Sequence, residues 1–204
     1  MLTKEKAEIL GLLCAEGTHY EYVSVETKFD KRRGKYYTHS RIREQIEFGN
    51  LNKLLLKHFQ YLLINVYKYP TKITGIPTSL KIHITKKDIM KDLLKYTDFN
   101  SDRWSVPNEV LTGSLEIKAA FIRGLYEGDG TKLQFANKTT PYVDFHMKNP
   151  TGLDSVAILL KSLGVNTRFW KSDYGRLVIY GLDDVRKFSR TIKPIFKRIK
   201  LNTN

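Results

Sequence analysis

Two acidic residues, Glu16 and Asp129, occupy the same position of a nine-residue pattern that occurs twice in the chain. The first copy is residues 9–17 (ILGLLCAEG) and the second is residues 122–130 (IRGLYEGDG). In each copy two small residues stand four positions apart, an acid follows the second of them, and a glycine closes the pattern. A closing glycine is typical of a helix C-terminus, so each acid is expected in the last turn of a helix.

A carboxylate in that place faces the negative end of the helix dipole, which disfavours it by a few tenths to about 1 kcal/mol. The small residues of the two copies are Gly11 with Ala15, and Gly124 with Gly128. Residues at i and i+4 share one helix face, and without side-chain bulk two backbones can approach closely there. Parallel packing of two such helices would bring the acids together, and a divalent cation between them would offset their charges.

The two patterns resemble the paired motifs of the LAGLIDADG homing endonucleases, whose family name is the consensus of this helix. Both copies keep glycine at the third position, leucine at the fourth, a small residue at the seventh, an acid at the eighth and glycine at the ninth. They depart at the sixth position, where Cys14 and Glu127 replace aspartate, and at the second, where Leu10 and Arg123 replace alanine. We expect Glu127 to cap or pair at the helix interface.

The resemblance implies Mg²⁺-dependent hydrolysis of double-stranded DNA, with a cut across the minor groove that leaves short 3′ overhangs. It also implies metal binding by Glu16 and Asp129, with the backbone carbonyls of Ala15 and Gly128 as further ligands. No His/Ser or Cys/His constellation near the acids suggests acyl chemistry, whereas carboxylate-bound metals suit phosphodiester hydrolysis. The alternative, two merely solvated helix ends, is disfavoured by the dipole cost and by the duplication.

Further catalytic candidates follow from the resemblance. Lys132, three residues after the second acid, matches a basic active-site position of single-chain members; its counterpart His19 either substitutes for it or has no role. Gln45 and Lys148, each expected at the end of the second strand of its half, match polar pocket positions. Any of these could instead be a plain phosphate contact. His58 is interpreted as a satisfied core residue.

The chain repeats one order of elements, helix–strand–strand–helix–strand–strand–helix. The resemblance covers nearly the whole chain and implies an α+β fold of two pseudo-symmetric repeats packed through the paired motif helices. We place the halves at 1–108 and 109–204, with the polar stretch 97–108 as a linker, and align residues 80–84 with 177–181. Residues 66–73 are interpreted as strand-like.

The hairpin strands of both halves are expected to carry one apolar face, covered by helices, and one polar, basic face open to solvent. In the first strand Val23, Val25 and Phe29 share the apolar face. Two such sheets would form a saddle over a long pseudo-palindromic site, since β-ribbons fit the major groove. For any single residue, an ordinary solvated sheet face is an equal alternative. The expected DNA-binding residues are Arg41, Arg43, Lys81, His83, His146, Arg168, Trp170 and Arg176.

Composition agrees with a polyanionic partner. Among 204 residues there are 35 Lys plus Arg and 21 Asp plus Glu, a formal net charge of +14. The apolar stretches around 54–56 and 158–160 are too short to span a bilayer, and the N-terminal residues lack the apolar core of a secretory signal. The single cysteine, Cys14, excludes internal disulfides and cysteine-cluster zinc sites. We therefore expect an intracellular protein, cytoplasmic or organellar.

These observations favour a monomeric, site-specific homing endonuclease with an internal pseudo-two-fold axis. An intron-encoded protein is favoured over an intein, because no part of the chain is free for splicing blocks. The alternative is an RNA maturase or a non-cleaving nucleic-acid-binding protein of the same fold, and RNA would be a partner only of a maturase. Retention of Glu16, Asp129 and Lys132 favours the nuclease. A membrane-surface protein ranks last, because no helix sets a strongly cationic face against a bulky apolar one.

Overall fold

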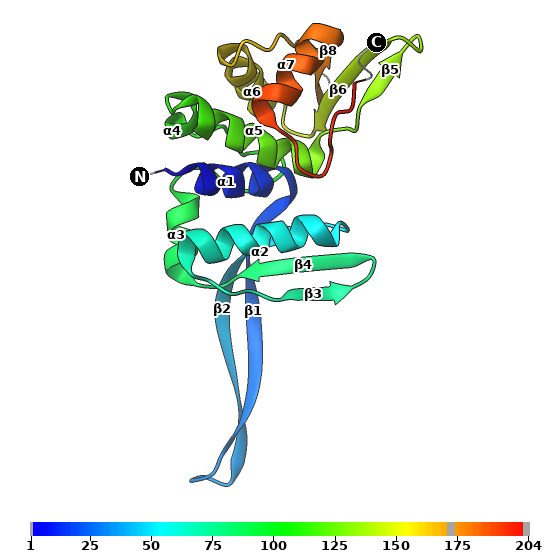
Figure 1. The fold of residues 1–204 in the computed structure, drawn as a ribbon. Helices are drawn as coiled ribbons and strands as arrows, with labels where there is room; N and C mark the ends of the chain where they lie inside the picture. Colours follow the sequence, from blue (N-terminus) through cyan, green and yellow to red (C-terminus); the bar gives the residue numbers. More distant parts are fainter. Residues whose placement is uncertain (1, 171–173, 202–204) are drawn as a thin grey trace.

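The computed structural model describes residues 2–170 and 174–201 and contains two similar halves separated by a pair of helices (Figure 1). The elements of the first half are α1 (Lys4–Glu16), β1 (Gly17–Asp30), β2 (Lys35–Gly49), α2 (Lys53–Tyr67), β3 (Ile73–Ile76), β4 (Ser79–Ile84) and α3 (Lys87–Leu94). After the short helix α4 (Asn108–Leu111), the second half contains α5 (Leu115–Asp129), β5 (Gln134–Ala136), β6 (Thr140–Met147), α6 (Pro150–Ser162), β7 (Arg168–Trp170), β8 (Gly175–Tyr180) and α7 (Leu182–Ile192).

Each half contains one four-stranded antiparallel sheet. The strand order is β1-β2-β4-β3 in the first sheet and β5-β6-β8-β7 in the second, so the two halves share one topology. This confirms the predicted α+β fold of two αββαββα repeats. Among the described residues, no helix is both long and apolar enough to cross a bilayer.

Helices α1 and α5 pack against each other through their small residues. A side chain at Gly11 would overlap the carbonyl of Phe121, and one at Gly124 would overlap the carbonyl of Glu8. Further along, a side chain at Gly128 would overlap Ala15. Because the contacts advance in the same direction along both helices, the pair is parallel and its C-terminal ends meet.

The glycines that close the two motifs do not adopt the left-handed conformation of a C′ cap. Gly17 has φ −86° and Gly130 has φ −67°, and each leads directly from its helix into extended chain. A side chain at Gly17 would overlap the carbonyl of Leu13, and one at Gly130 would overlap the ring of Tyr126. Glycine is needed there because space is lacking, not because the backbone is left-handed.

The strand-like interpretation of residues 66–73 is wrong. Helix α2 continues to Tyr67 and ends at Lys68, which takes the left-handed conformation (φ 51°) and donates its backbone N–H to the carbonyl of Ile64. The strand begins only at Ile73. The apolar stripe of the helix, which includes the buried Leu62 and Leu63, outweighs the β-branched residues that follow it.

The connection between the halves is more than a polar linker. Phe99, Trp104 and Val106 are buried within it. The carbonyl of Trp104 accepts a hydrogen bond of 2.5 Å from the side chain of Asn149, which caps α6. The connection is therefore packed into the second half, which fixes the path between the repeats.

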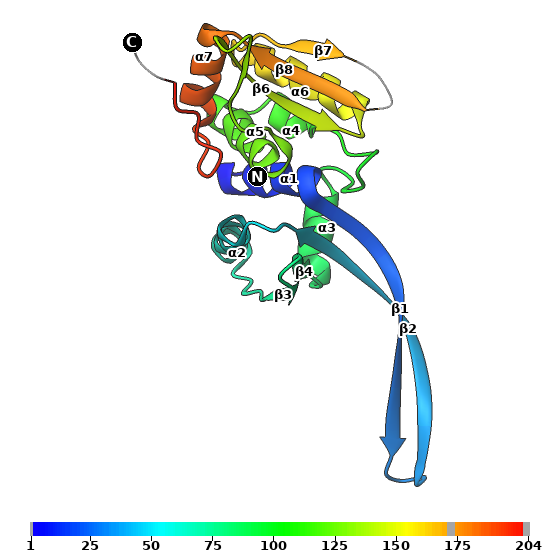
Figure 2. The ribbon, with the colours of Figure 1, turned by 90° about the vertical axis from the view of Figure 1, so that its right-hand side faces the viewer.

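Strands β1 and β2 continue far beyond the rest of the first sheet as an isolated ribbon (Figures 1 and 2). β4 pairs with β2 only over Ile46–Gly49, whereas the β1–β2 pairing runs on to Asp30 opposite Lys35. The expectation that helices cover the apolar face of this hairpin is wrong. Its members Val23, Val25 and Ile42 are 64%, 62% and 73% exposed, because the ribbon outruns the helices.

The strand registers also correct the internal alignment. Gly17 pairs with Phe48 and Gly130 with Phe145; these partners in turn face Ile82 and Leu177. Leu177 therefore corresponds to Ile82, two residues from the alignment expected on sequence. By the same register Gln45 and Tyr142 are equivalent, since each lies three residues before its half's phenylalanine. The expected equivalence of Gln45 and Lys148 is wrong.

The close approach of the two motif helices predicts a large effect of one methyl group. Gly11→Ala should lower the free energy of unfolding by roughly 2 kcal/mol, because the overlap with rigid backbone outweighs the usual helix-propensity gain of about 1 kcal/mol. Urea denaturation measures this change. Gly49→Ala is the control, because a side chain there meets nothing closer than 3.8 Å. Equal stability of both variants would contradict the packing described.

Candidate active site and nucleic-acid interface

The carboxylates of Glu16 and Asp129 meet where the parallel helices α1 and α5 end. Burial, and then the charge of Glu16, raise the pKa of Asp129 to about 7. Burial also raises the pKa of Glu16, against the opposing effects of Asn50 and Lys197. The two acids therefore form one electrostatically coupled pair.

Glu16 has a polar neighbour that sequence reasoning missed. The side-chain amide of Asn50 donates a hydrogen bond of 2.8 Å to its carboxylate. Asn50 directly follows β2, and together with Gly49 and Lys81 it lines a shallow hollow beside Glu16. An asparagine between a strand and a helix reads as an ordinary turn residue, so the sequence carried no signal for this contact.

A lysine remote in sequence lies beside Asp129. The ammonium of Lys197 donates to the carbonyls of Gly128 at 2.7 Å, Gly130 at 2.6 Å and Tyr126 at 3.1 Å. Burial lowers the pKa of Lys197, although the charges of nearby acids oppose that effect. Lys197 stands in a basic C-terminal stretch without periodicity, so nothing in the sequence singled it out.

Lys132 belongs to the same neighbourhood. Its positive charge contributes to lowering the pKa of Lys197, and both residues line a shallow depression with Phe196. His19, its counterpart in the first half, instead contacts Glu44 at 2.7 Å. The two halves thus differ at this position.

The structure does not bring the remaining catalytic candidates to the acids. Gln45 is buried, and its amide bonds to the hydroxyl of Tyr20 and to His83. Lys148 is exposed just beyond β6, with its ammonium 6.0 Å from the ring centroid of Tyr174. Among the described residues, no contact joins either side chain to the carboxylate pair.

The donors at the helix ends suit a hard divalent cation. Two carboxylates and the backbone carbonyls of Ala15 and Gly128 are oxygen ligands of the type that Mg²⁺, Ca²⁺ and Mn²⁺ prefer. Burial and the charge of Glu16 raise the pKa of Asp129 even though the charge of Lys197 opposes them, so a divalent cation between the acids would be stabilised. Over residues 2–170 and 174–201, no cluster of three or more His, Cys, Asp or Glu offers another metal site.

The predicted polar face of the first sheet forms as one surface. Arg41, Arg43 and Gln45 of β2 share it with Lys81 and His83 of β4, because Glu47 lies opposite His83 and Gly49 opposite Lys81. Acids are interleaved with the bases. Lys81 contacts Glu47 at 2.7 Å, and Arg43 pairs with Glu26 on β1. The face is therefore a charged network rather than a uniform basic patch.

The second sheet presents a corresponding face. His146, Arg168, Trp170 and Arg176 point to one side, opposite the buried Val143, Phe145 and Leu177. Arg176 contacts the carboxylate of Asp144 at 2.6 Å. The guanidinium of Arg168 lies 4.8 Å from the ring centroid of Tyr180. Arginine, histidine and tryptophan on an open sheet face are typical of nucleic-acid contacts.

Comparison with known proteins places this geometry in a family context. Residues 116–193 match the family model of the LAGLIDADG-like domain. Nearly the whole chain is similar to mesophilic variants of the homing endonuclease I-DmoI, with a TM-score of 0.64, 21% identity, and coverage of 93% of this chain and 94% of that chain. The chain is a two-motif protein of the LAGLIDADG fold.

Two further structures share the LAGLIDADG fold with this chain. I-DmoI in complex with DNA and Mn has a TM-score of 0.62 at 19% identity, covering 93% of this chain and 96% of that one. The N-terminal LAGLIDADG domain of DUF199/WhiA has a TM-score of 0.59 at 14% identity, covering 94% and 82%. At these identities the likeness shows the fold alone. No curated protein sequence gives a significant match.

One departure from the LAGLIDADG consensus has a structural reason in Arg123. Its guanidinium contacts the buried carboxylate of Glu8 on α1 at 2.5 Å, and His58 of α2 contacts the same carboxylate at 2.8 Å. Burial would raise the pKa of Glu8, but the hydrogen bonds and charges of these two partners outweigh it and lower the pKa. This network ties α1, α2 and α5 together, and His58 is a satisfied interior residue as expected.

The departure at Glu127 serves the C-terminal segment rather than the helix pair. Its buried carboxylate accepts the backbone N–H groups of Ile195, of Phe196 at 2.9 Å and of Lys197 at 3.1 Å. The expectation that Glu127 pairs at the α1–α5 interface is wrong. The acid instead fixes the segment that carries Lys197.

The raised pKa of Asp129 predicts how stability depends on pH in the metal-free protein. The folded state holds this proton up to about pH 7, whereas an unfolded aspartate loses it near about pH 3.9. The stabilisation is therefore complete below about pH 4 and is lost as pH rises through about 7. Asp129→Asn should remove that loss and raise the free energy of unfolding at pH 8 by roughly 1–3 kcal/mol.

Urea denaturation in EDTA at pH 5 and pH 8 measures this. Asp102→Asn is the control, because Asp102 is exposed and its carboxylate contacts Arg103. Parallel pH dependences for wild type and Asp129→Asn would show that the carboxylate is not held as described.

Proposed function

We propose that this chain is a site-specific homing endonuclease that binds a long pseudo-palindromic double-stranded DNA site and hydrolyses both strands. The observation that carries this proposal is the half-buried, coupled pair of Glu16 and Asp129 at the ends of two parallel helices. Burying two adjacent carboxylates is costly unless a cation joins them. The match to I-DmoI bound to DNA and Mn supports the same activity class.

In this proposal Glu16 and Asp129 bind a divalent cation, which we take to be Mg²⁺, together with the carbonyls of Ala15 and Gly128. When bound, such a cation lowers the pKa of a water and stabilises charge on the leaving oxygen. Lys132 is proposed to hold the scissile phosphate, because its charge already reaches the site.

Two other candidates receive more modest roles. Gln45 is proposed to orient the polar network of the first sheet through Tyr20 and His83. Lys148 is proposed as a phosphate contact, the alternative that its exposed position favours.

The DNA interface is proposed to consist of the two open sheet faces. The first face carries Arg41, Arg43, Lys81 and His83, and the second carries His146, Arg168, Trp170 and Arg176.

The ribbon of β1 and β2 extends the first of these faces. From Glu21 opposite Glu44 to Asp30 opposite Lys35 it has ten residue pairs, which span about 34 Å. That is about one turn of B-DNA. Hairpin β5–β6 has only three pairs, so the footprint is proposed to be longer on the first half's side.

Intron encoding, short 3′ overhangs and action as a monomer in the cell interior complete the proposal by resemblance to the family. The likeness to DUF199/WhiA keeps a second candidate open, a nucleic-acid-binding protein that does not cleave, including an RNA maturase. The two candidates differ in whether Glu16 and Asp129 are needed for activity.

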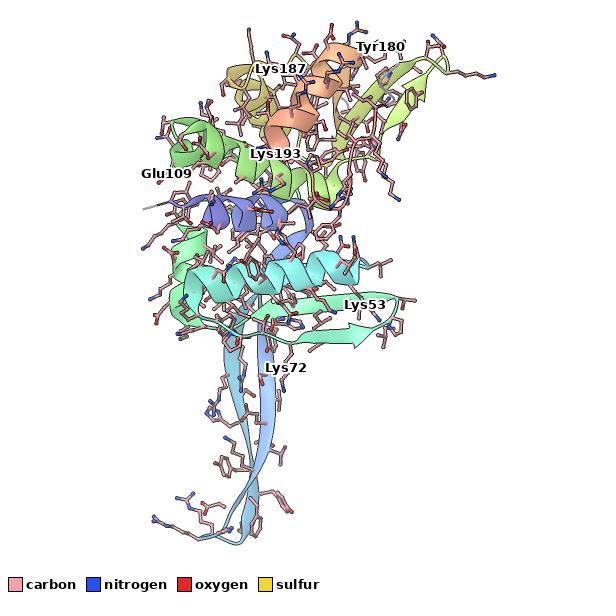
Figure 3. All side chains as sticks on the ribbon, in the orientation of Figure 1. Lys53, Lys72, Glu109, Tyr180, Lys187 and Lys193 are labelled. Atoms are coloured by element: carbon pink, nitrogen blue, oxygen red, sulfur yellow. The ribbon has the colours of Figure 1, made fainter. Side chains whose placement is uncertain are left out.

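The metal-binding role predicts a separation of cleavage from binding. With Mg²⁺, wild-type protein should cut a randomised duplex library at one long recurring sequence, and Glu16→Gln or Asp129→Asn should lower cleavage at least about 100-fold. Both variants should still bind that sequence in Ca²⁺, because the sheet faces are intact. The control is Glu109→Gln, an exposed acid on α4 away from the helix ends (Figure 3). Undiminished cleavage by both site variants would refute the assignment.

The ribbon tip predicts a change in salt dependence. Replacing Lys31, Arg32 and Arg33 by alanine should reduce the slope of log affinity against log salt by about 2–3, since each lost phosphate contact removes about 0.9. The footprint should shorten at one end only. The matched control replaces Lys187, Arg190 and Lys193, exposed residues at and just after α7 (Figure 3). Equal slopes for the two triple variants would show that the tip does not reach DNA.

A further inference from the structure

The C-terminal segment, residues 193–201, places a positive charge inside the candidate metal site. We propose that the Lys197 ammonium is a tethered cation that holds the Gly128 carbonyl in the metal-free protein and must release it when a divalent cation binds. The inference rests on the proposed function, because it requires the Glu16–Asp129 metal site. It assigns to Lys197 a regulatory role that the motif residues do not have.

The contacts of Lys197 exhaust its donors. A lysine ammonium has three N–H groups, and three carbonyl oxygens at the end of α5 lie 2.6–3.1 Å from the nitrogen. One of them is Gly128, the carbonyl proposed as a metal ligand. A cation at the C-terminal end of a helix is favoured by the helix dipole. In the absence of metal, Lys197 therefore supplies the positive charge that the end of α5 and its acid require.

The lysine is held in place by its own backbone. Glu127 accepts the N–H groups of residues 195–197, while Lys197 donates back to the carbonyls beside Glu127. Phe196 packs edge-on against His58, with ring centroids 5.8 Å apart. These contacts tie the segment to both α5 and α2. These contacts therefore hold the Lys197 ammonium in a fixed position at the end of α5.

A divalent cation and the Lys197 ammonium would compete for the Gly128 carbonyl oxygen. A metal ion coordinated by Asp129 and the Gly128 carbonyl would stand against a positive charge already bonded to that carbonyl. A divalent cation and an ammonium that both contact the Gly128 carbonyl would repel each other strongly in a partly buried site. The contacts of the ammonium lie on the α5 side, whereas Glu16 accepts from the neutral amide of Asn50 and is reached by Lys197 only through its charge. Metal binding and docking of Lys197 are therefore opposed, and thermodynamic linkage makes the opposition reciprocal.

The test is calorimetric titration of the full-length, DNA-free protein with Ca²⁺ at pH 8, which measures metal affinity without cleavage. Lys197→Met keeps the length of the side chain and removes its charge. It should bind Ca²⁺ roughly tenfold more tightly than wild type, within the usual range of coupling between sites. The control is Lys200→Met, an exposed lysine of the same segment, which should change the affinity less than about twofold.

A second variant guards against a folding defect in the first. Glu127→Gln weakens the tether but leaves Lys197 in the chain. Loss of a nearby negative charge by itself weakens cation binding, so tighter Ca²⁺ binding by Glu127→Gln would support release of the lysine. Unchanged or weaker binding by both Lys197→Met and Glu127→Gln would overturn the inference.

The failure of the metal site itself is distinguishable. If wild type binds Ca²⁺, Glu16→Gln abolishes that binding and the Lys197 variant equals wild type, the metal site stands and only the competition is refuted. If neither wild type nor the Lys197 and Glu127 variants bind Ca²⁺, both the metal site and the inference are refuted.

Discussion

The contact on which the structure depends is the backbone-to-backbone packing of α1 against α5. At Gly11 and Gly124 there is no room for even a methyl group, because carbonyls of the opposite helix fill the space. The contacts run in the same direction along both helices, so the pair is parallel and the two helix C-termini meet. The sheets of the two halves are then held on either side of that junction, and a site assembled from both halves follows from the packing of two glycine faces.

The same packing brings two negative carboxylates together at two helix C-termini, and the two halves stabilise them differently. Two half-buried acids, Glu16 and Asp129, lie where the negative ends of two helix dipoles meet. At α1 the amide of Asn50 donates to Glu16, whereas at α5 the ammonium of Lys197 donates to three carbonyls at the helix end. The asymmetry extends outward, since one hairpin is a long ribbon and the other is short. A pseudo-symmetric fold thus carries two unlike halves, which suits the pseudo-palindromic site proposed for it.

Local patterns predicted most of the fold. Glycine spacing placed Asp129 in the last turn of a helix, which is where α5 ends, and alternation identified the face that carries Arg41, Arg43 and Lys81. What alternation cannot tell is whether a helix reaches an apolar face, so the exposure of Val23 and Ile42 was missed. The hydrophobic pattern also failed to predict that Trp104 is buried, because isolated apolar residues in a polar stretch have neither helical nor strand periodicity.

The sequence pointed to Glu16, Asp129 and Lys132 in the candidate site but not to Asn50 or Lys197. Glu16 and Asp129 can be recognised from sequence because they occupy the same position of a repeated motif. Lys197 cannot, because the carbonyls it contacts lie 67 to 71 residues earlier in the chain. A basic tail offers several equivalent lysines, and only the tether through Glu127 selects this one. The role of Glu127 in turn depends on three backbone N–H groups, which no side-chain pattern encodes. Side-chain contacts to backbone groups are the part of a site that is hardest to predict from a sequence.

The central claim is that Glu16 and Asp129 hold a divalent cation between the ends of the motif helices. Anomalous diffraction from crystals of the protein–DNA complex grown with Mn²⁺ tests it most directly. We expect an anomalous peak within coordination distance, about 2.0–2.6 Å, of both carboxylates. That peak should be absent from crystals of the Asp129→Asn complex. A well-ordered complex with Mn²⁺ bound elsewhere, or with none between the two acids, would contradict it.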